Sequence, residues 1–315
     1  MRRILRGRVV CAALGPTTRA RSHATNKLRA VSIEEVDLRH CGVEHAICCF
    51  VNVQERWLVD PGPEVSYRTL LAALPEDFVP ETILLTHIHF DHAGATGRLL
   101  ERWPSAQVWV HERGARHLID PTKLVASATR IYGDDFARLW GEVVAIPEDH
   151  VKVLTGAEDL KGWRVQHTPG HASHHVSYLH EASGTAFTGD VAGVRVLDGP
   201  VFPPTPPPDI DLDLWRASVD LVQSWAPQAL ALTHFGTHTD VDAHLEALRE
   251  GLARWGERAR TSGETEYADQ VRAFIHGEVT DPVTRAAYEQ ANPPSTLWAG
   301  MNRYWTKKAQ QDAAA

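Results

Sequence analysis

Long hydrophobic runs are missing from this chain of 315 residues. A membrane-spanning helix needs ~20 consecutive apolar residues, so we expect no membrane-embedded segment. The G-x-S-x-G motif that presents a serine nucleophile in many hydrolases is missing too, which disfavours a Ser-His-Asp mechanism. Because 43% of the residues are hydrophobic, the chain still has ample material for a sizeable folded core.

Cysteine is scarce, with four residues in the whole chain. They are Cys11, Cys41, Cys48 and Cys49, which form no C-x-x-C pair and lie apart from the histidine motifs. Cys48 and Cys49 are neighbours in an apolar run, and adjacent strand residues point to opposite faces, which disfavours a disulfide between them. We therefore expect free thiols and a reducing, cytoplasmic location.

Acidic residues are absent from residues 1–30, which contain eight Arg or Lys. A disordered extension explains this composition, and an organellar targeting segment is the second interpretation; residues 9–14 are too short an apolar run for a secretory signal. The rest of the chain holds 24 basic and 40 acidic residues, a formal net charge of −16. Such an acidic body argues against a nucleic-acid partner.

Histidine, in contrast, is plentiful, and residues 87–92 contain three imidazoles and a carboxylate within six positions. The apolar run at residues 82–85 predicts a buried strand that leads into this H-x-H-x-D-H motif. His87 and His89 would leave the strand together, and Asp91 and His92 would follow on the next turn. Solvated loop histidines rarely gather so tightly, so we interpret the motif as metal-binding.

Single polar residues follow four other predicted strands, and most of them stand in turns with Gly or Pro. Strands of a β-sandwich can share one edge, so these residues are expected to converge with the histidine motif. The first of them also fits a plain Asp-Pro-Gly turn. They are Asp60 after residues 56–59, His171 after 163–167, Asp190 after 185–188 and His234 after 229–233.

Together these motifs resemble those of the metallo-β-lactamase superfamily, and their pattern is most similar to its glyoxalase II-like hydrolases. The resemblance implies an α+β fold, a four-layer αβ/βα metallo-β-lactamase sandwich, over residues 31–260. Residues 261–315, which no motif covers, would form a C-terminal helical appendage. Amphipathic patterns there predict short helices over residues 264–276, 282–290 and 295–307.

The resemblance also implies a dinuclear site for two Zn²⁺ ions, with iron or manganese as alternatives. A hydroxide between the ions would be the nucleophile, with Asp91 and Asp190 as the catalytic carboxylates. Asp60, His174 and His175 would support the ligands without binding metal. The first ion would be held by His87, His89 and His171, the second by Asp91, His92 and His234, and both by Asp190.

The implied activity is hydrolysis of an ester, thioester or lactone bond in a small molecule. Gly193 stands three residues after Asp190, where quorum-quenching lactonases are expected to carry Tyr, and this disfavours a lactone. A glutathione thioester would call for a basic cluster in the C-terminal helices, for which the candidates are Arg303, Lys307 and Lys308.

Three alternatives stay open. A mononuclear iron enzyme similar to persulfide dioxygenases would use His87, His171 and Asp190 as its two-His-one-carboxylate triad. A phosphodiesterase of the same fold is the second, and a metal-bound regulatory module without turnover is the third. The sequence also allows a homodimer.

Two segments outside the motifs are predicted to shape the substrate pocket. Residues 123–140 have helical periodicity but interrupt the strand rhythm, so they are interpreted as an insertion near the site. Residues 201–208 are too rich in proline for a helix or strand and predict a stiff extended loop. Arg130 and Tyr132 in the insertion are candidate substrate contacts, although packing on a surface helix explains them equally well.

Overall fold

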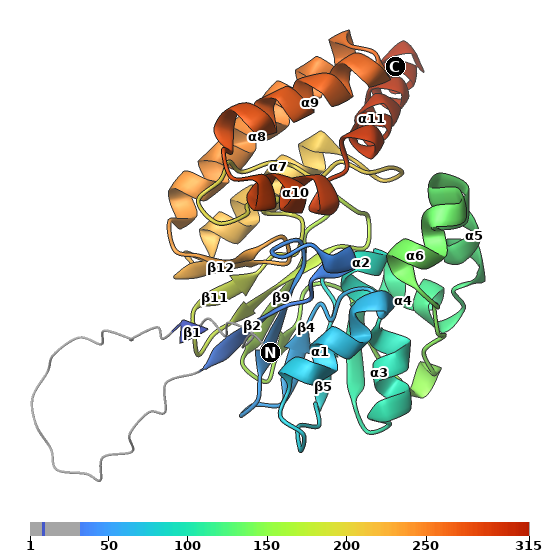
Figure 1. Cartoon of the computed structure of the whole chain (residues 1–315), viewed down its shortest axis with the longest axis vertical. Coiled ribbons are helices and arrows are strands. Elements are labelled where there is room, and N and C mark those ends of the chain that lie inside the picture. The colour runs from blue at the N-terminus through green and yellow to red at the C-terminus, as the bar shows by residue number, and fades with distance from the viewer. Residues whose placement is uncertain (1–7, 10–31, 315) are drawn as a thin grey trace, which may run out of the picture.

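A computed structural model describes residues 8–9 and 32–314, arranged as two β-sheets packed face to face with helices on both outer sides (Figure 1). Helices α1 and α3 lie on one side of the sheets, and α7 to α11 lie on the other (Figure 1). This is the predicted four-layer αβ/βα sandwich. The interpretation of residues 1–30 falls outside the described residues, apart from Arg8–Val9.

The first sheet contains seven described strands in sequence order. Pairing is antiparallel from β1 to β4 and parallel from β4 to β7. Because parallel strands end at the same edge, the segments that follow β4, β5 and β6 emerge side by side. The strands are β1 (Arg8–Val9), β2 (Ile33–Asp37), β3 (Cys48–Asn52), β4 (Trp57–Val59), β5 (Thr82–Leu84), β6 (Gln107–His111) and β7 (Val151–Leu154).

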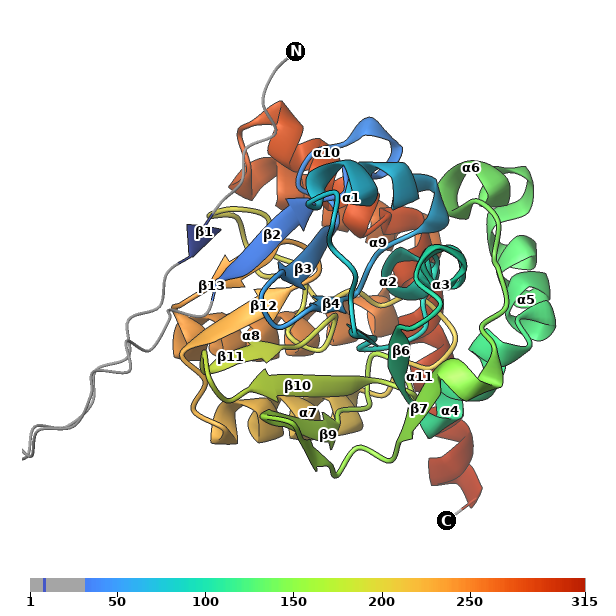
Figure 2. The ribbon, with the colours of Figure 1, turned by 90° about the horizontal axis from the view of Figure 1, so that it is seen from below.

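The second sheet has the order β13-β12-β11-β10-β9-β8, with one parallel pair, β11 and β12. Because β11 and β12 are parallel, they end at the same edge of this sheet. Figure 2 shows the second sheet, from β9 to β13, beside β2, β3 and β4 of the first. Two short strands, β8 and β13, were not predicted. The strands are β8 (Asp159–Leu160), β9 (Trp163–His167), β10 (Val176–His180), β11 (Thr185–Phe187), β12 (Ala229–Leu232) and β13 (Gly236–His238).

Eleven α-helices surround the sheets in the described part of the chain. The predicted insertion over residues 123–140 forms two helices, α5 and α6, because Gly133 takes a positive φ of 54° between them. The helices are α1 (Tyr67–Ala73), α2 (Phe90–Ala93), α3 (Thr96–Arg102), α4 (Glu112–Ile119), α5 (Thr122–Tyr132), α6 (Phe136–Trp140), α7 (Leu212–Ser224), α8 (Val241–Thr261), α9 (Glu264–Glu278), α10 (Pro282–Ala291) and α11 (Pro294–Ala314).

Aromatic side chains fill the space between the two sheets. Phe50 meets Phe187 edge to face with ring centroids 5.3 Å apart, and Trp57 meets Trp163 at 5.1 Å. Each pair adds about 0.5–1.5 kcal/mol beyond the burial of its surface. These ring contacts fix how the two sheets pack on each other, and thereby position the residues at the strand ends of both sheets.

The C-terminal helices share one apolar core with α7 and α8. Fully buried side chains from all five helices meet there: Trp215, Trp255, Tyr267, Tyr288 and Met301. The three predicted C-terminal helices are therefore confirmed, and they pack as part of the sandwich. Among the described residues, no helix combines the length and the apolar character needed to cross a membrane.

Candidate metal centre

Seven polar side chains converge where strands of both sheets end, and they are the seven predicted as ligands. They form two groups in which the candidate ligand atoms all lie within 4.8 Å of one another. The strands β5, β9, β11 and β12 carry them, directly or through the short helix α2 and the turn before β10. The groups are His87, His89, His171 and Asp190, and Asp91, His92 and His234.

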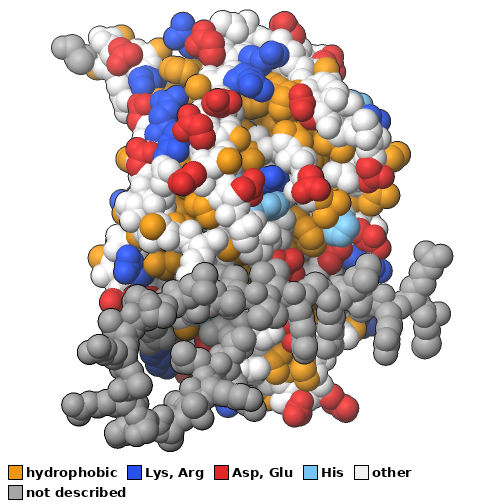
Figure 3. All heavy atoms as spheres, turned by 90° about the vertical axis from the view of Figure 1, so that its left-hand side faces the viewer, with side chains coloured by type: hydrophobic (Ala, Val, Ile, Leu, Met, Phe, Trp, Pro, Cys, Tyr) orange, Lys and Arg blue, Asp and Glu red, His pale blue; other side chains and the backbone are white. Residues whose placement is uncertain are grey.

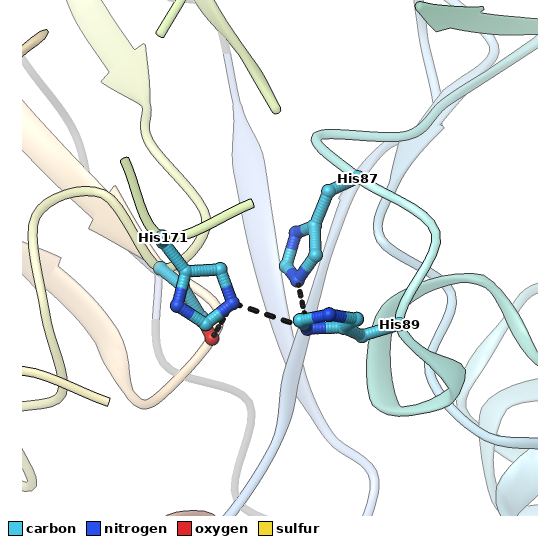
Figure 4. A group of neighbouring side chains, drawn as sticks. His87, His89 and His171 are labelled. Carbon is cyan, nitrogen blue, oxygen red and sulfur yellow. Dashed lines mark hydrogen bonds and ion pairs between the residues drawn. The ribbon is translucent and has the colours of Figure 1, made fainter. Parts of the chain in front are cut away.

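The first group is centred on His89. Its Nδ1 lies 2.9 Å from Nε2 of His87 and 3.1 Å from Nε2 of His171, and Figure 4 shows both imidazoles directed toward it. Nε2 of His171 lies 3.2 Å from Oδ2 of Asp190. Ligand atoms held ~2.0–2.2 Å from a tetrahedral ion lie about 3.3–3.6 Å apart, so the spacings here are slightly shorter than the edges of one coordination sphere and need only a small expansion to hold an ion.

The second group leaves lone pairs without partners. Nε2 of His92 and Nε2 of His234 are buried and have no hydrogen-bond partner among the described residues. Asp91 faces both, with Oδ2 lying 3.3 Å from Nε2 of His234 and 3.8 Å from Nε2 of His92. Leaving a buried polar atom unpaired costs about 1–3 kcal/mol, and a cation between these three ligands would remove that cost.

Asp190 stands between the two groups. Its Oδ2 faces His171 at 3.2 Å, while its Oδ1 lies 3.2 Å from Nε2 of His92 and 3.6 Å from Nε2 of His234. One carboxylate thus presents a separate oxygen to each group. Gly189 makes this approach possible, because a Cβ at that position, where φ is 46°, would lie 2.4 Å from Oγ1 of Thr86.

Hydrogen bonds to the far ring nitrogens fix the tautomers of the histidines. Nδ1–H of His171 donates to the carbonyl of Pro204 at 2.9 Å, and Nδ1–H of His234 donates to the carbonyl of Ala46 at 2.6 Å. Nδ1 of His92 is 2.8 Å from Oδ2 of Asp60. With Nδ1 engaged in this way, each Nε2 faces the centre, where its neutral form can bind a metal.

Asp60 supports the centre from behind, in the position predicted for it. The side chain is fully buried and also accepts the backbone N–H of Thr86 at 2.8 Å, the hydroxyl of Thr86 at 2.7 Å and the hydroxyl of Thr233 at 2.8 Å. Thr86 follows β5 and Thr233 follows β12, so this one carboxylate ties the two sheets together. Its backbone has a positive φ of 48°, which Asp adopts in turns more readily than most residues other than Gly.

Burial keeps the histidines at the start of the first group neutral. It lowers the pKa of His87 well below 6.5 and the pKa of His89 to about 4, and neighbouring imidazoles lower both pKa values further. For His92, burial acts in the same direction, but the carboxylates of Asp190, Asp91 and Asp60 outweigh it and raise the pKa. Neutral imidazoles are the form that binds metal, so His87 and His89 need lose no proton at neutral pH.

A cavity of about 960 Å³ opens above the centre, and His89, Asp91, Asp190 and His234 form its floor. Its side walls come from three parts of the chain. Residues of α4, α5 and α6 form one wall and prolines of the predicted stiff loop, among them Pro204, form another. Residues 290–293, 296 and 297, around the connection from α10 to α11, form the third.

The substrate contacts predicted in the insertion separate in the structure. Tyr132 lines the cavity, but Arg130 is exposed and does not line it. The predicted basic cluster of the C-terminal helices is also absent from the cavity wall: Lys308 pairs with Asp213, and Nε of Arg303 donates to the carbonyl of Pro208. The geometry supports neither Arg130 nor that cluster as a substrate contact.

The structure adds wall residues that the sequence reasoning missed. Arg113, Arg116 and Lys123 line the cavity and stand in no motif. His40 also lines it; its Nε2–H donates to the carbonyl of Leu139, and its Nδ1 accepts from the amide of Gln290, which joins two walls. Helical periodicity could have indicated that residues 113 and 116 share a face, but not which face.

The histidines near the centre that are not among the seven candidate ligands occupy different positions. His174 lines the cavity and His175 is buried behind the centre, and neither belongs to a ligand group. His111 is buried and caps α4 by accepting the N–H of Arg113. His117 lines the cavity.

A sandwich of two sheets with buried histidines and carboxylates gathered at the strand ends forms a candidate metal centre. The chain belongs to the metallo-beta-lactamase superfamily, whose family model matches residues 50–234, more than half of the sequence. Members of this superfamily are mostly hydrolytic enzymes that bind divalent metals.

Two curated proteins illustrate the relationship. The metallo-beta-lactamase fold-containing protein ST1585 of Sulfurisphaera tokodaii is 35% identical over 161 residues, which are 49% of this chain and 60% of that protein. A hydroxyacylglutathione hydrolase of Legionella pneumophila is 32% identical over 149 residues, 45% of this chain and 46% of that protein. The chain thus spans about half the length of the curated relatives it matches.

The fold itself has a close counterpart among solved structures. The crystal structure of the archaeal superfamily protein ST1585 from Sulfolobus tokodaii superposes with a TM-score of 0.64 and 24% identity, covering 85% of this chain and 97% of that one. The match extends well beyond residues 50–234, so the shared architecture includes elements outside the region of the family model.

Proposed function

We propose that the protein is a hydrolase that binds two divalent metal ions, most simply zinc, and cleaves an ester or thioester bond in a small molecule. The observation that carries this proposal is the position of Asp190, with one carboxylate oxygen facing each of two complete ligand groups. A site for a single iron would leave the buried Nε2 atoms of His92 and His234 unpaired, which counts against the dioxygenase alternative.

The residues present fit this pair of ions, since neutral imidazoles and carboxylates are the usual ligands of zinc. When bound, two divalent ions supply Lewis-acid polarisation of the scissile carbonyl and lower the pKa of water to near 7. His87, His89, His171 and Asp190 would hold one ion and Asp91, His92, His234 and Asp190 the other.

The floor of the cavity also contains a carboxylate, Asp91, that can accept a proton from the attacking water. Asp91 lines the cavity, and His92 and His234 hold the pKa of its carboxyl below the usual range despite burial, which acts in the opposite direction. An ionised carboxylate can accept a proton from the attacking water and, once protonated, can pass it to the leaving group. A thiol, with an ordinary pKa of about 8.5, needs little help to leave, so this floor suits thioesters better than amides.

Similarity to the Legionella protein, which is named for hydrolysis of an acylglutathione, supports the thioester as the first substrate to try. In such a reaction the oxygen of water joins the acyl carbon, the carbon–sulfur bond breaks, and the released sulfur takes up the second proton of the water. The products are a carboxylic acid and a thiol.

The proposal is tested by removing metal from the purified protein, reconstituting it with Zn²⁺, and assaying chromogenic thioesters, esters and phosphodiesters. We expect two zinc ions per chain by elemental analysis and thioester turnover that chelation abolishes. His171→Ala should lose metal and activity, while His276→Ala, which changes an exposed histidine paired with Glu289, should keep both. One metal per chain after full reconstitution would overturn the dinuclear site, and lack of turnover on the whole panel would overturn the hydrolase.

A further inference from the structure

The cavity carries a positive edge that the proposed chemistry does not use. Arg113 and Arg116 on α4 and Lys123 on α5 line the cavity, and we call these three side chains the cationic rim. All three are exposed, and none has an ion pair within the described residues. Glu112 and Asp209 are the other charged wall residues besides the metal centre.

The cationic rim is distinguished by its place on the cavity edge, because other basic side chains of the described residues, such as Arg68 and Lys161, also lack an ion pair. On the face shown in Figure 3, basic and acidic side chains stand interspersed. Some arginines elsewhere have carboxylate partners, such as Arg249 with Asp220 at 2.7 Å and Arg195 with Asp240 at 2.8 Å. Nε of Arg116 donates to Nε2 of His117 at 3.2 Å, but no residue of the rim has a carboxylate partner among the described residues. Three such cations on one edge of the cavity favour an anion there.

The rim lies directly beside the metal centre. Helix α4 packs on the loops that carry the ligands, because a Cβ at Gly114 would lie 2.7 Å from Cγ2 of Ile88 and 3.6 Å from Cβ of His174. Ile88 stands between His87 and His89. Residues 113 and 116 are three apart on α4, so their side chains leave the same face of the helix. One small molecule can reach both the rim and the metal centre.

The neighbouring wall is apolar. Side chains of α5 and α6 form a small cluster with Phe90 that includes Ala128 and Trp140, with Leu124 and Tyr132 packed against it. Ile131, on the same wall, is 47% exposed. An apolar group would bury this surface, while a charged group would lose its hydration there.

The geometry points to a substrate with two dissimilar parts: an apolar acyl group that packs on α5 and α6, and an anionic group that binds Arg113, Arg116 and Lys123. The inference rests on the proposed ester or thioester hydrolysis and adds the substrate class and the residues that select it. Phosphate and carboxylate are both anions of this kind, and the guanidinium fork suits either one.

The test compares thioesters that share one hexanoyl group and differ only in the thiol. N-acetylcysteamine is neutral, glutathione carries carboxylates, and coenzyme A carries phosphates. We expect the metal-loaded wild-type protein to show a kcat/KM at least tenfold higher for one or both anionic thioesters than for the neutral one. Higher salt should shrink this preference. Whether glutathione or coenzyme A gains more identifies the anion as carboxylate or phosphate.

The variant that removes the rim is the triple change Arg113→Gln, Arg116→Gln and Lys123→Gln. It should abolish the preference and leave kcat/KM for the neutral thioester unchanged. A matched control loses the same charge at three exposed positions outside the cavity, through Arg68→Gln, Arg130→Gln and Lys161→Gln, and should keep the preference. If the rim variant keeps its preference, or if the control loses it equally, the inference is overturned while the hydrolase stands.

Failure of the proposed hydrolysis is recognised separately, because the wild-type protein would then turn over none of the three thioesters. In that event the rim is judged by calorimetry with S-hexyl thioether analogues of glutathione and coenzyme A. Binding to the wild-type protein at least tenfold tighter than to the rim variant supports the anion site. Equal binding, or none, overturns it.

Discussion

Replacing Asp60 by Asn should destabilise the fold and weaken metal binding together. Oδ2 of Asp60 faces three donors, the hydroxyls of Thr86 and Thr233 and Nδ1 of His92, and Oδ1 faces the N–H of Thr86. The best an amide can do is to place its oxygen toward the three donors and its NH₂ toward the fourth. One buried charged hydrogen bond is then lost, at about 1.5–3 kcal/mol, and the other three lose the help of the charge.

We therefore expect Asp60→Asn to lower the free energy of unfolding by about 3 kcal/mol, which for a domain of this size corresponds to a fall in Tm of roughly 5 °C. Zinc affinity should fall about 10–100-fold, because the neutral amide holds the ring of His92 less firmly than the carboxylate does. Differential scanning fluorimetry and competition with a zinc-binding dye measure the two effects. Asp211→Asn, which keeps a good capping residue at the start of α7, is the control. A variant with unchanged Tm and unchanged zinc affinity would refute the role given to Asp60.

Three further expectations follow from the structure. Asp190→Asn should reduce the content of both metals and abolish turnover, whereas Asp209→Asn, which removes a carboxylate from the cavity wall, should keep two metals by elemental analysis. Tyr132→Ala should enlarge the cavity beside the apolar wall, so the acyl chain that gives the highest kcat/KM should become longer. An unchanged preferred acyl length would contradict the place of Tyr132 in that wall. Burial lowers the pKa of His244 from 6.5 to about 4, so the folded state resists a proton that the unfolded chain takes up. The free energy of unfolding is therefore unaffected by this residue above about pH 6.5, and at pH 5 it is lower by about 2 kcal/mol. His244→Gln should flatten that loss of Tm between pH 7 and pH 5, and equal slopes would refute it.

The convergence of the seven candidate ligands could be predicted from the sequence because their positions depend on local rules. Each follows a short apolar strand, and a glycine directly precedes His171 and Asp190, so the ends of β5, β9, β11 and β12 were visible in the sequence. The seven ligand atoms then had only one edge of the sandwich at which to meet. Strands β8 and β13 were not predicted because they are short and, unlike the other three-residue strands, are not apolar runs.

The cavity walls could not be predicted, since they depend on how helices pack rather than on the helices themselves. Periodicity indicated a helical insertion, but not which of its faces borders the cavity. Arg130 and Tyr132 lie two positions apart on α5 and leave different faces of the helix, and only Tyr132 lines the cavity. Nothing in the sequence near Arg113 or Asn292 shows that these residues, far apart in the chain, border one space. Such contacts between distant segments are fixed by tertiary packing alone.

The third wall of the cavity lies outside the region that defines the family. The family model ends at His234, the last of the seven candidate metal ligands, while residues 290–293, 296 and 297 beside the cavity come more than fifty positions later. One wall of the cavity is thus encoded apart from the candidate ligands, whereas the cationic rim and the apolar wall lie within the region of the family model. Recombination that exchanged the segment encoding α10 and α11 between relatives would change the third wall in one step and leave the seven candidate ligands as they are.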